Sequence, residues 1–411
     1  MKVVGLIAEY NPFHNGHQYH IEQALKLTNA DAALVVMSGN YVQRGAPALM
    51  PKHLRAESAL KCGASAVFEL PVCYASGSAE YFALGAVSLL EQLGCVDSIC
   101  FGAETADIDA LHAIAEILIN EPYSYRRILQ DSLKSGLSFP SARQHALSEY
   151  LGDSVLASYV EQPNNILGIE YLKALHRLQS NIKPYALKRT GAGYHDLHTG
   201  SAFSSASAIR NVLANTEVFD PALLEPLLPA KVRQIISSHW ETRFPIYSND
   251  FSLLLKYKLL SMQPKDLIQY SDVTEDLANR IQKQKNQFLS FKQFCELLKT
   301  KQFTYTRISR ALLHILLDIK KEDMEQYISN YYHGYARLLG FRTDQSTLLT
   351  LAKKTSSIPI LTKLTATEQI PEAFLSMLEH DIWASNLYES VITDKYQTAF
   401  QNEYEQQIVR I

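Results

Sequence analysis

Short apolar segments rich in β-branched residues recur through the first half of the chain at roughly thirty-residue intervals, the length of a βαβ unit. The strands that they predict are Val3 to Ala8, Ala32 to Met37, Ala66 to Leu70, Ser98 to Phe101 and, after a gap, Pro184 to Lys188. Amphipathic helical patterns follow the first four strands, at His17 to Leu27, Lys52 to Cys62, Ala79 to Leu93 and Ile108 to Ile119. This alternation predicts an α/β fold, a Rossmann-like doubly wound parallel sheet.

The pattern changes after the fifth predicted strand. A helix opening near Ser204 closes the first domain at about residue 215, and a helical insertion covers about residues 121–180. Beyond this point long amphipathic patterns dominate, at Asp276 to Phe288, Phe291 to Leu298 and Ile308 to Ile319. Only Ile358 to Leu361 resembles a strand. We therefore expect two domains, 1–215 and 216–411, the second a mainly α-helical C-terminal domain.

Composition agrees with a globular, cytoplasmic protein. Of the 411 residues, 47% are hydrophobic and 20% are charged, and the net charge of −3 leaves a nucleic-acid partner open. The first apolar run stops at Glu9 and Tyr10, which is too short for a signal peptide, and no stretch approaches the ~18 apolar residues of a membrane span. The five cysteines form no Cys-x-x-Cys pair and are typical of reduced thiols. We expect no membrane partner, and the sequence does not define the oligomeric state.

The strongest chemical signal is the segment Tyr10 to His17, which follows the first predicted strand directly. Parallel sheets bind ligands at the carboxyl ends of their strands. Gly16 lets a ligand approach the backbone, and the helix that begins here offers free N–H groups and the positive end of its dipole to a phosphate. His14 and His17 can both donate hydrogen bonds to phosphate oxygens. We therefore predict an ATP-binding domain in which these two histidines are catalytic and promote attack on the α-phosphate.

Other interpretations of the histidines are weaker on chemical grounds. A single histidine often caps a helix. His14, His17 and His20 are also spaced like metal ligands, as are His195 and His198, but no nearby cysteine or carboxylate completes a ligand set. We therefore expect no protein metal site. The Gly-x₄-Gly-Lys-Ser/Thr loop and a full Gly-x-Gly-x-x-Gly motif are both missing from the sequence.

A second phosphate-binding pattern opens the helix after the last predicted strand. It runs from Ser205 to Arg210, where hydroxyl and N–H groups can hold a phosphate and Arg210 adds a fixed positive charge. Serine clusters are also ordinary N-caps. The pattern gains weight because it lies at the other end of the domain that carries the histidine motif.

These residues resemble the nucleotidyltransferase superfamily that shares His-x-Gly-His and a distal Ser-Ser/Thr-x-Ile-Arg motif, with Ala206 as a departure from the second motif. Further segments occur in order at Ser38 to Gly45, Phe101 to Glu104, Pro163 to Gly168 and Leu187 to Arg189. Together with the helical C-terminal half they make the chain similar to the bacterial tRNA(Met) cytidine acetate ligases over essentially its whole length.

The resemblance implies an ATP-dependent ligase that forms a carbon–nitrogen bond in two steps. Acetate would attack the α-phosphate of ATP, giving acetyl-adenylate and pyrophosphate, with Mg²⁺ accompanying the nucleotide. The N4 amine of the wobble cytidine 34 in elongator tRNA(Met) would then take the acetyl group, giving N4-acetylcytidine and AMP. Two alternatives stay open: an adenylyltransferase acting on a small phosphorylated acceptor, and a non-catalytic ATP-sensing RNA-binding protein.

The resemblance also implies which residues bind ATP. They are Ile7, Ala8, Glu9, Tyr10, Asn11, Pro12, Phe13, His14, Asn15, Gly16, His17, Gln18, Tyr19, His20, Gly102, Asn164 and Arg189, and the second phosphate pattern adds Ser205 and Arg210. Gly102 leaves room for an adenosine, and Arg189 can pair with a phosphate. Asn164 can hydrogen-bond the base or ribose, although its neighbour Asn165 has the same chemistry.

A basic stretch in the C-terminal half marks where RNA would bind. Between Lys299 and Lys363 there are eleven basic residues against five acidic ones, a net charge of +6. Tyrosines lie among them and could stack on unpaired bases, at Tyr305, Tyr327, Tyr331, Tyr332 and Tyr335. A solvated helix surface with core tyrosines has the same pattern, and the resemblance favours RNA. The predicted tRNA contacts are Arg307, Arg310, Arg337 and Arg342.

Overall fold

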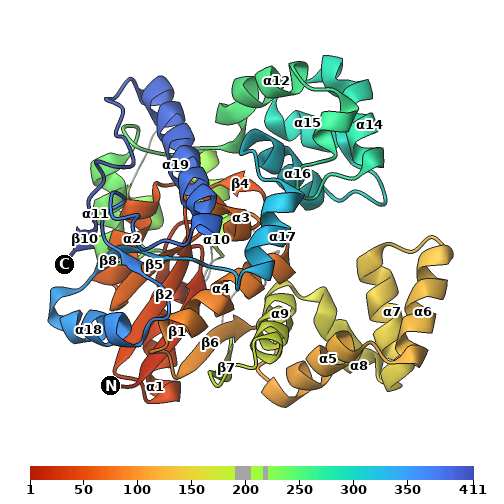
Figure 1. The fold of residues 1–411 in the computed structure, drawn as a ribbon, viewed down its shortest axis with the longest axis horizontal. Helices are drawn as coiled ribbons and strands as arrows, with labels where there is room; N and C mark the ends of the chain where they lie inside the picture. Colours follow the sequence, from red (N-terminus) through yellow and green to blue (C-terminus); the bar gives the residue numbers. More distant parts are fainter. Residues whose placement is uncertain (190–204, 216–220) are drawn as a thin grey trace.

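The computed structural model describes residues 1–189, 205–215 and 221–411. Within these residues the centre of the molecule is an eight-stranded sheet in the order β10-β8-β5-β2-β1-β6-β7, with β9 beside β8 (Figure 1). Its strands are β1 (Val3–Ala8), β2 (Ala32–Ser38), β5 (Ala66–Leu70), β6 (Ser98–Ala103), β7 (Lys183–Lys188), β8 (Ala336–Phe341), β9 (Ile360–Leu361) and β10 (Val409–Arg410). A separate hairpin joins β3 (Tyr41–Val42) to β4 (Ala46–Pro47).

The strands predicted from the apolar segments all form. β1, β2, β5, β6 and β7 pair in parallel, so the predicted α/β fold with a mainly parallel sheet is confirmed. Every residue of β2 and β5 is buried, which explains why the sequence shows continuous apolar runs rather than alternation.

The C-terminal half completes this sheet. β8 pairs antiparallel with β5, placing Arg337 opposite Glu69, and β9 and β10 pair in parallel with β8. The sequence predicted a strand at β9 but not at β8. A domain boundary after residue 215 stays a prediction, and the sheet itself extends beyond it.

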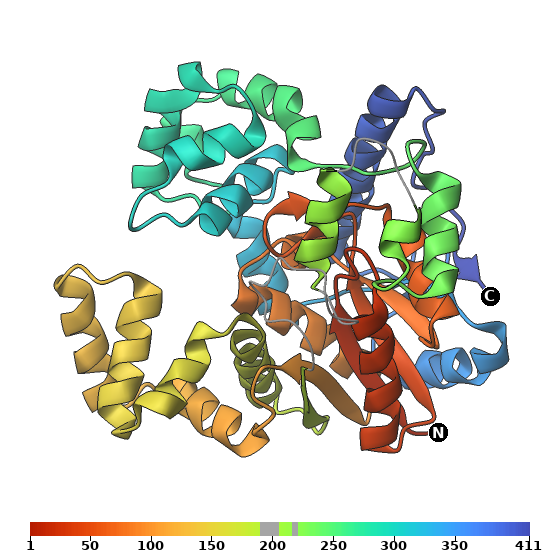
Figure 2. The ribbon, with the colours of Figure 1, turned by 180° about the vertical axis from the view of Figure 1, so that it is seen from behind.

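Helices cover both faces of the sheet (Figures 1 and 2). One face carries α1 (Asn15–Thr28), α2 (Lys52–Lys61), α10 (Ala206–Ala214) and α11 (Ala230–His239). The other carries α3 (Val72–Ala75), α4 (Ala79–Leu93), α5 (Ile108–Asn120), α9 (Pro163–Arg177), α17 (Lys321–Ser329), α18 (Ser346–Thr355) and α19 (Leu375–Tyr396). Alternate residues of β2 belong to the two cores, since Leu34 and Val36 face one side while Val35 and Met37 face the other.

Two helical bodies project from the sheet and lie on the same side of the molecule in Figures 1 and 2. The predicted insertion forms α6 (Tyr123–Lys134), α7 (Phe139–Leu151) and α8 (Ser154–Ala157) ahead of α9. The second body, residues 248–316, is here called the helical lobe; it contains α12 (Ser252–Leu260), α13 (Pro264–Leu267), α14 (Glu275–Gln284), α15 (Phe291–Leu298) and α16 (Tyr305–Leu316). Short 3-10 turns lie at Ser158–Glu161, Pro221–Leu224, Ser248–Phe251, Lys285–Gln287, Thr343–Gln345 and Glu372–Phe374.

Hydroxyl side chains fix where the lobe helices begin. Thr274, Ser290 and Thr304 precede α14, α15 and α16, and each side-chain oxygen accepts the N–H three residues later. The predicted helix at Phe291 to Leu298 matches α15. Among the described residues, no helix combines the length and the apolar character that crossing a bilayer requires.

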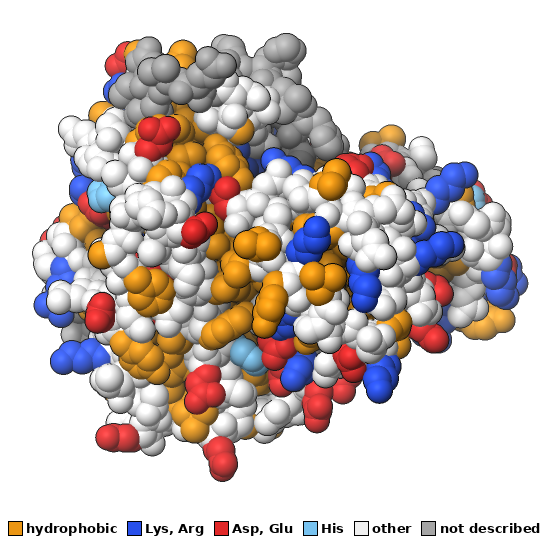
Figure 3. Space-filling view, turned by 90° about the horizontal axis from the view of Figure 1, so that it is seen from above, with side chains coloured by type: hydrophobic (Ala, Val, Ile, Leu, Met, Phe, Trp, Pro, Cys, Tyr) orange, Lys and Arg blue, Asp and Glu red, His pale blue; other side chains and the backbone are white. Residues whose placement is uncertain are grey.

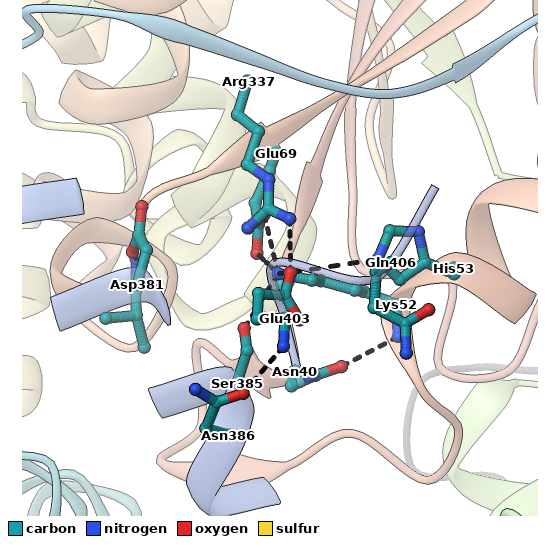
Figure 4. Close-up of polar contacts among 12 residues, drawn as sticks. Asn40, Lys52, His53, Glu69, Arg337, Asp381, Ser385, Asn386, Glu403 and Gln406 are labelled. Atoms are coloured by element: carbon teal, nitrogen blue, oxygen red, sulfur yellow. Dashed lines mark hydrogen bonds and ion pairs between the residues drawn. The ribbon is translucent and has the colours of Figure 1, made fainter. Parts of the chain in front are cut away.

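A buried ion network ties the C-terminal segment to the sheet (Figure 4). It consists of Lys52, Glu69, Arg337 and Glu403, whose side chains are at most 6% exposed. Lys52 Nζ lies 2.8 Å from Glu69 Oε1 and 2.7 Å from Glu403 Oε1, and Arg337 contacts both carboxylates. Two cations therefore face two anions, which is the balanced pairing that a buried charge requires.

Candidate active site

A pocket of about 420 Å³ opens at the carboxyl ends of β1, β6 and β7. Thirteen of the predicted ATP contacts line it, namely Ile7, Ala8, Glu9, Tyr10, Asn11, His14, Gly16, His17, Tyr19, His20, Gly102, Asn164 and Arg189. The other predicted contacts do not line it, namely Pro12, Phe13, Asn15, Gln18, Ser205 and Arg210. The fold thus gathers residues far apart in the sequence at the strand edge where parallel sheets bind ligands.

The turn after β1 is held in a conformation that bulky residues rarely adopt. Tyr10 has φ 47°, in the left-handed region, and is almost completely buried. Two arginines, one from α2 and one from α10, hold the carbonyls beside it: Arg55 Nη1 donates to Glu9 O at 2.5 Å and Arg210 Nη1 donates to Asn11 O at 2.6 Å. A strained backbone of this kind persists only where surrounding contacts hold it in place, and such positions are common at ligand sites.

The two histidines are fixed as neutral donors. His14 Nδ1 accepts the Gly16 N–H at 3.1 Å, and His17 Nδ1 accepts the His14 N–H at 3.3 Å. Each neutral ring therefore carries its proton on Nε2. Burial and the nearby cations Arg189 and Arg210 lower the pKa of His14 to about 3, and burial together with His14 lowers the pKa of His17 well below its usual value. Both Nε2–H groups are thus available to ligand oxygens at neutral pH without a charge on the ring.

Two arginines add positive charge beside these donors. Arg189 lines the pocket. Its backbone N–H donates to the carbonyl oxygen of Ala103, at the end of β6, at 2.9 Å. Arg210 does not line the pocket but holds Asn11 O, and its Nη2 bonds Ser207 Oγ at 3.0 Å. Ser205 caps α10 by accepting the Ala208 N–H. Burial lowers the pKa of both arginines, but their intrinsic pKa keeps them charged. This excess of cations favours an anionic ligand.

The structure distinguishes the two asparagines of the Pro163 to Gly168 segment. Asn164 lines the pocket, and its Nδ2 donates to Glu104 Oε1 at 2.5 Å. Asn165 is fully buried, and its Oδ1 accepts the Thr105 N–H at 3.1 Å. Asn164 is therefore the one that a nucleotide can reach. Gly102 lies inside β6, where a Cβ would touch Arg189 Cγ at 3.4 Å.

Several pocket residues were not among the predicted site residues. Gln43 and Arg44 reach the pocket from the β3–β4 hairpin, and Phe82 and Tyr171 line it from α4 and α9. Gln43 and Arg44 belong to the Ser38 to Gly45 segment noted in the sequence, whereas Phe82 and Tyr171 are indistinguishable there from core positions. Their proximity to the histidines depends on the fold alone.

The predicted RNA contacts on α16 lie next to this hairpin. Ser309 Oγ donates to Gly45 O at 2.8 Å, and a Cβ on Gly45, whose φ is +74°, would lie 2.3 Å from Arg310 N. Arg307 lies over the Phe303 ring at 5.3 Å, and Arg310 Nε bonds Asp272 Oδ2 at 2.8 Å. The hairpin therefore joins the pocket to the helical lobe. Seen from above, Lys and Arg side chains are numerous on the side of the molecule that carries this lobe (Figure 3).

The other two predicted RNA contacts lie elsewhere. Arg337 is buried in the ion network, so RNA cannot reach it, and this prediction is corrected. Arg342 follows β8 at the amino edge of the sheet, where its backbone N–H bonds Ser65 O and its side chain pairs with Asp344. Among the tyrosines, Tyr327 and Tyr335 are core residues, whereas Tyr331 is 80% exposed. Sequence spacing alone did not separate buried from exposed positions.

Within the described part of the chain, no three His, Cys, Asp or Glu side chains are arranged to hold a metal ion. His195 and His198 lie outside the described residues.

Comparisons with known proteins agree with this geometry. The HIGH Nucleotidyl Transferase family model matches residues 1–404. The tRNA(Met) cytidine acetate ligases of Acetivibrio thermocellus and Alkaliphilus metalliredigens are each 40% identical to this chain, over 392 and 400 residues, covering 94% of this chain and 94% of theirs. A crystal structure of Thermotoga maritima TmcAL bound with alpha-thio ATP is 33% identical, with a TM-score of 0.90 and complete coverage of both chains. The apo form of the same protein gives a TM-score of 0.92.

Proposed function

Since this chain belongs to the HIGH nucleotidyl transferase family, among its tRNA(Met) cytidine acetate ligases, we propose that it activates acetate as acetyl-adenylate and transfers the acetyl group to N4 of the wobble cytidine of elongator tRNA(Met). The observation that carries this proposal is the pair of neutral Nε2–H donors on His14 and His17 beside two arginines. ATP and tRNA are both cytoplasmic, so we place the reaction there.

In the first step the enzyme has to stabilise charge rather than supply a base. Acetate is already an anion, and its carboxylate oxygen forms a bond to the α-phosphorus while the bond to pyrophosphate breaks. Donors preorganised around the reacting phosphate lower this barrier because they need no reorganisation during the reaction. We assign that role to His14 and His17, with Arg189 neutralising a phosphate and Asn164 holding the nucleoside. We also propose that the remaining predicted ATP contacts, including Ser205 and Arg210, take part in binding ATP.

Mg²⁺ fits this pocket as a companion of the nucleotide. Mg²⁺ in nucleotide sites is held by few carboxylates and mostly by phosphate oxygens and water. Glu9 is the sole carboxylate among the described residues that line the pocket. The ion would therefore be held chiefly by ATP itself and would supply charge neutralisation to the departing pyrophosphate.

We propose that the RNA approaches along the β3–β4 hairpin and α16. Arg44 lies at the pocket and is exposed, and α16 carries Arg307 and Arg310 beside the same hairpin. Cations in this arrangement suit the phosphates next to an unstacked base. Arg342 lies at the other edge of the sheet, so the proposed path along the hairpin does not include it.

The decisive experiment is acetate-dependent exchange of labelled pyrophosphate into ATP, using the full chain without RNA. Exchange that requires acetate is the expected result, and it excludes both a binding protein and a transferase for phosphorylated acceptors. The His14→Ala, His17→Ala double variant should lose this exchange. The proposed reaction would be overturned if the wild type with acetate showed no exchange, either without RNA or after addition of tRNA(Met).

A further inference from the structure

The pocket has two halves on either side of β1. The sheet order places β6 and β7 on one side and β2 and β5 on the other. Three of the nucleotide contacts proposed outside the β1–α1 turn, Gly102, Asn164 and Arg189, line the pocket from the β6 and β7 side. The opposite half is lined by Gln43 and Arg44 of the hairpin that follows β2. This half is available to the second substrate.

Glu9 lies where the two halves meet, at the end of β1. Its carboxylate is aimed by the hairpin, because Oε1 accepts the Gln43 N–H at 3.0 Å. Burial lowers the pKa of Arg44 and of Arg210, and the charge of Glu9 opposes that shift in both, so the carboxylate lies within electrostatic reach of each. No other carboxylate of the described residues lines the pocket.

Five other titratable groups of the pocket are poorly suited to accept a proton from the cytidine amine. His14 and His17 use Nδ1 for backbone N–H groups and carry protons on Nε2. Burial raises the pKa of Tyr10 and Tyr171 above the usual value, which keeps both phenols protonated. His20 has a buried Nε2 without a partner among the described residues, but it lies beside Cys100 of β6, on the nucleoside side.

We propose that Glu9 is the general base of the acetyl-transfer step, which deepens the proposed function and rests on it. The N4 lone pair of the cytidine forms a bond to the acetyl carbon, and the bond from that carbon to the phosphate oxygen breaks. The electron pair of the broken bond leaves with AMP, and the N4 proton passes to the Glu9 carboxylate and then to solvent. Glu9 takes no part in bond making during acetate activation, since the attacking acetate carries no proton.

The test separates the two steps in the Glu9→Gln variant. A glutamine carbonyl can still accept the Gln43 N–H, so the turn is preserved while the basic oxygen is lost. Acetate-dependent pyrophosphate exchange is measured first, without RNA. Single-turnover acetylation of unmodified elongator tRNA(Met) is then measured from synthetic acetyl-adenylate. Glu116→Gln, on an exposed position of α5, is the matched control for the loss of one carboxylate.

Glu9→Gln should slow acetyl transfer by about 100-fold or more, the usual contribution of a general base, and the loss in transfer should exceed any loss in exchange by about tenfold or more. Glu9→Asp should recover part of the transfer rate, and Glu116→Gln should match the wild type in both assays. Transfer at the wild-type rate in Glu9→Gln would overturn the proposal. So would an equal loss of exchange and transfer, which would assign Glu9 to the nucleotide or its Mg²⁺. If the wild type catalysed pyrophosphate exchange but neither it nor any variant acetylated the tRNA, the proposed function itself would be refuted.

Discussion

Two clusters of charged side chains lie at the carboxyl edge of the sheet, and they differ in how their charges are matched. In the ion network, two cations and two carboxylates lie within about 3 Å of one another and are almost fully buried. In the pocket, the lining cations Arg44, Lys188 and Arg189 outnumber Glu9, the one lining carboxylate among the described residues, and two neutral histidines add Nε2–H donors. A cluster with equal numbers of cations and carboxylates needs no ligand, whereas a cluster with an excess of cations favours the binding of an anion.

The two clusters also respond differently to mutation. Removing one partner of a buried balanced cluster leaves an uncompensated charge and destabilises the fold. Removing a donor from an unbalanced pocket leaves the fold intact and lowers activity, because its partner is the ligand. Paired measurements of stability and exchange therefore distinguish structural from functional charges.

The largest effect should follow from Arg337→Met. This change leaves Lys52 as the one cation of the network to balance the carboxylates of Glu69 and Glu403, so we expect a loss of about 3–5 kcal/mol in the free energy of unfolding. Urea denaturation followed by circular dichroism measures it. Arg342→Met is the control, because its pair with Asp344 is partly exposed and should contribute about 1 kcal/mol or less. Equal stability of the two variants would contradict a structural role for the network.

For His14→Asn we expect a loss of activity without a loss of stability. The Asn Oδ1 can still accept the Gly16 N–H and cap α1, while the Nε2–H donor is lost. We expect an unchanged melting temperature and a decrease of about 10²–10³-fold in the rate of pyrophosphate exchange. A variant that loses stability but keeps exchange would place His14 with the structural residues.

Asp381 provides a smaller, pH-dependent effect beside the network (Figure 4). Its carboxylate accepts the Val72 N–H at 2.7 Å and the Tyr335 hydroxyl at 2.6 Å, and burial, followed by the charge of Glu69, raises its pKa to about 7. Because this pKa is raised above the unfolded value, its contribution to stability is complete at low pH and is lost as pH rises through 7.

We therefore expect the stability of the wild type relative to that of Asp381→Asn to fall by about 1–2 kcal/mol between pH 5.5 and pH 8. Melting temperatures at both pH values measure this difference. Glu403 does not obscure the result, because its pKa is lowered by Lys52 and Arg337 and its contribution is lost only in acid. An unaltered pH dependence in the variant would contradict the raised pKa of Asp381.

The sequence predicts those features of the fold and the site whose residues are close together in the chain, and it misses those formed by residues that are far apart. The β1–α1 turn carries strand, glycine and histidines in one segment, so its place and chemistry follow from sequence. β8 was missed because its pairing with β5 joins residues more than 250 positions apart. Arg337 was mistaken for an RNA contact for the same reason, since its partners Glu69 and Glu403 are distant in sequence.

The smallest effect concerns the surface arginines, and it extends the comparison to RNA. Arg307 lies on α16 beside the hairpin that enters the pocket, whereas Arg342 lies at the other edge of the sheet. If RNA approaches along the hairpin, Arg307→Ala should weaken tRNA(Met) binding several-fold and reduce the salt dependence of log K by about 1, the value expected for one phosphate contact. Arg342→Ala should change neither quantity. Filter binding over a range of salt concentrations measures both, and the reverse pattern would move the RNA path to the opposite edge of the sheet.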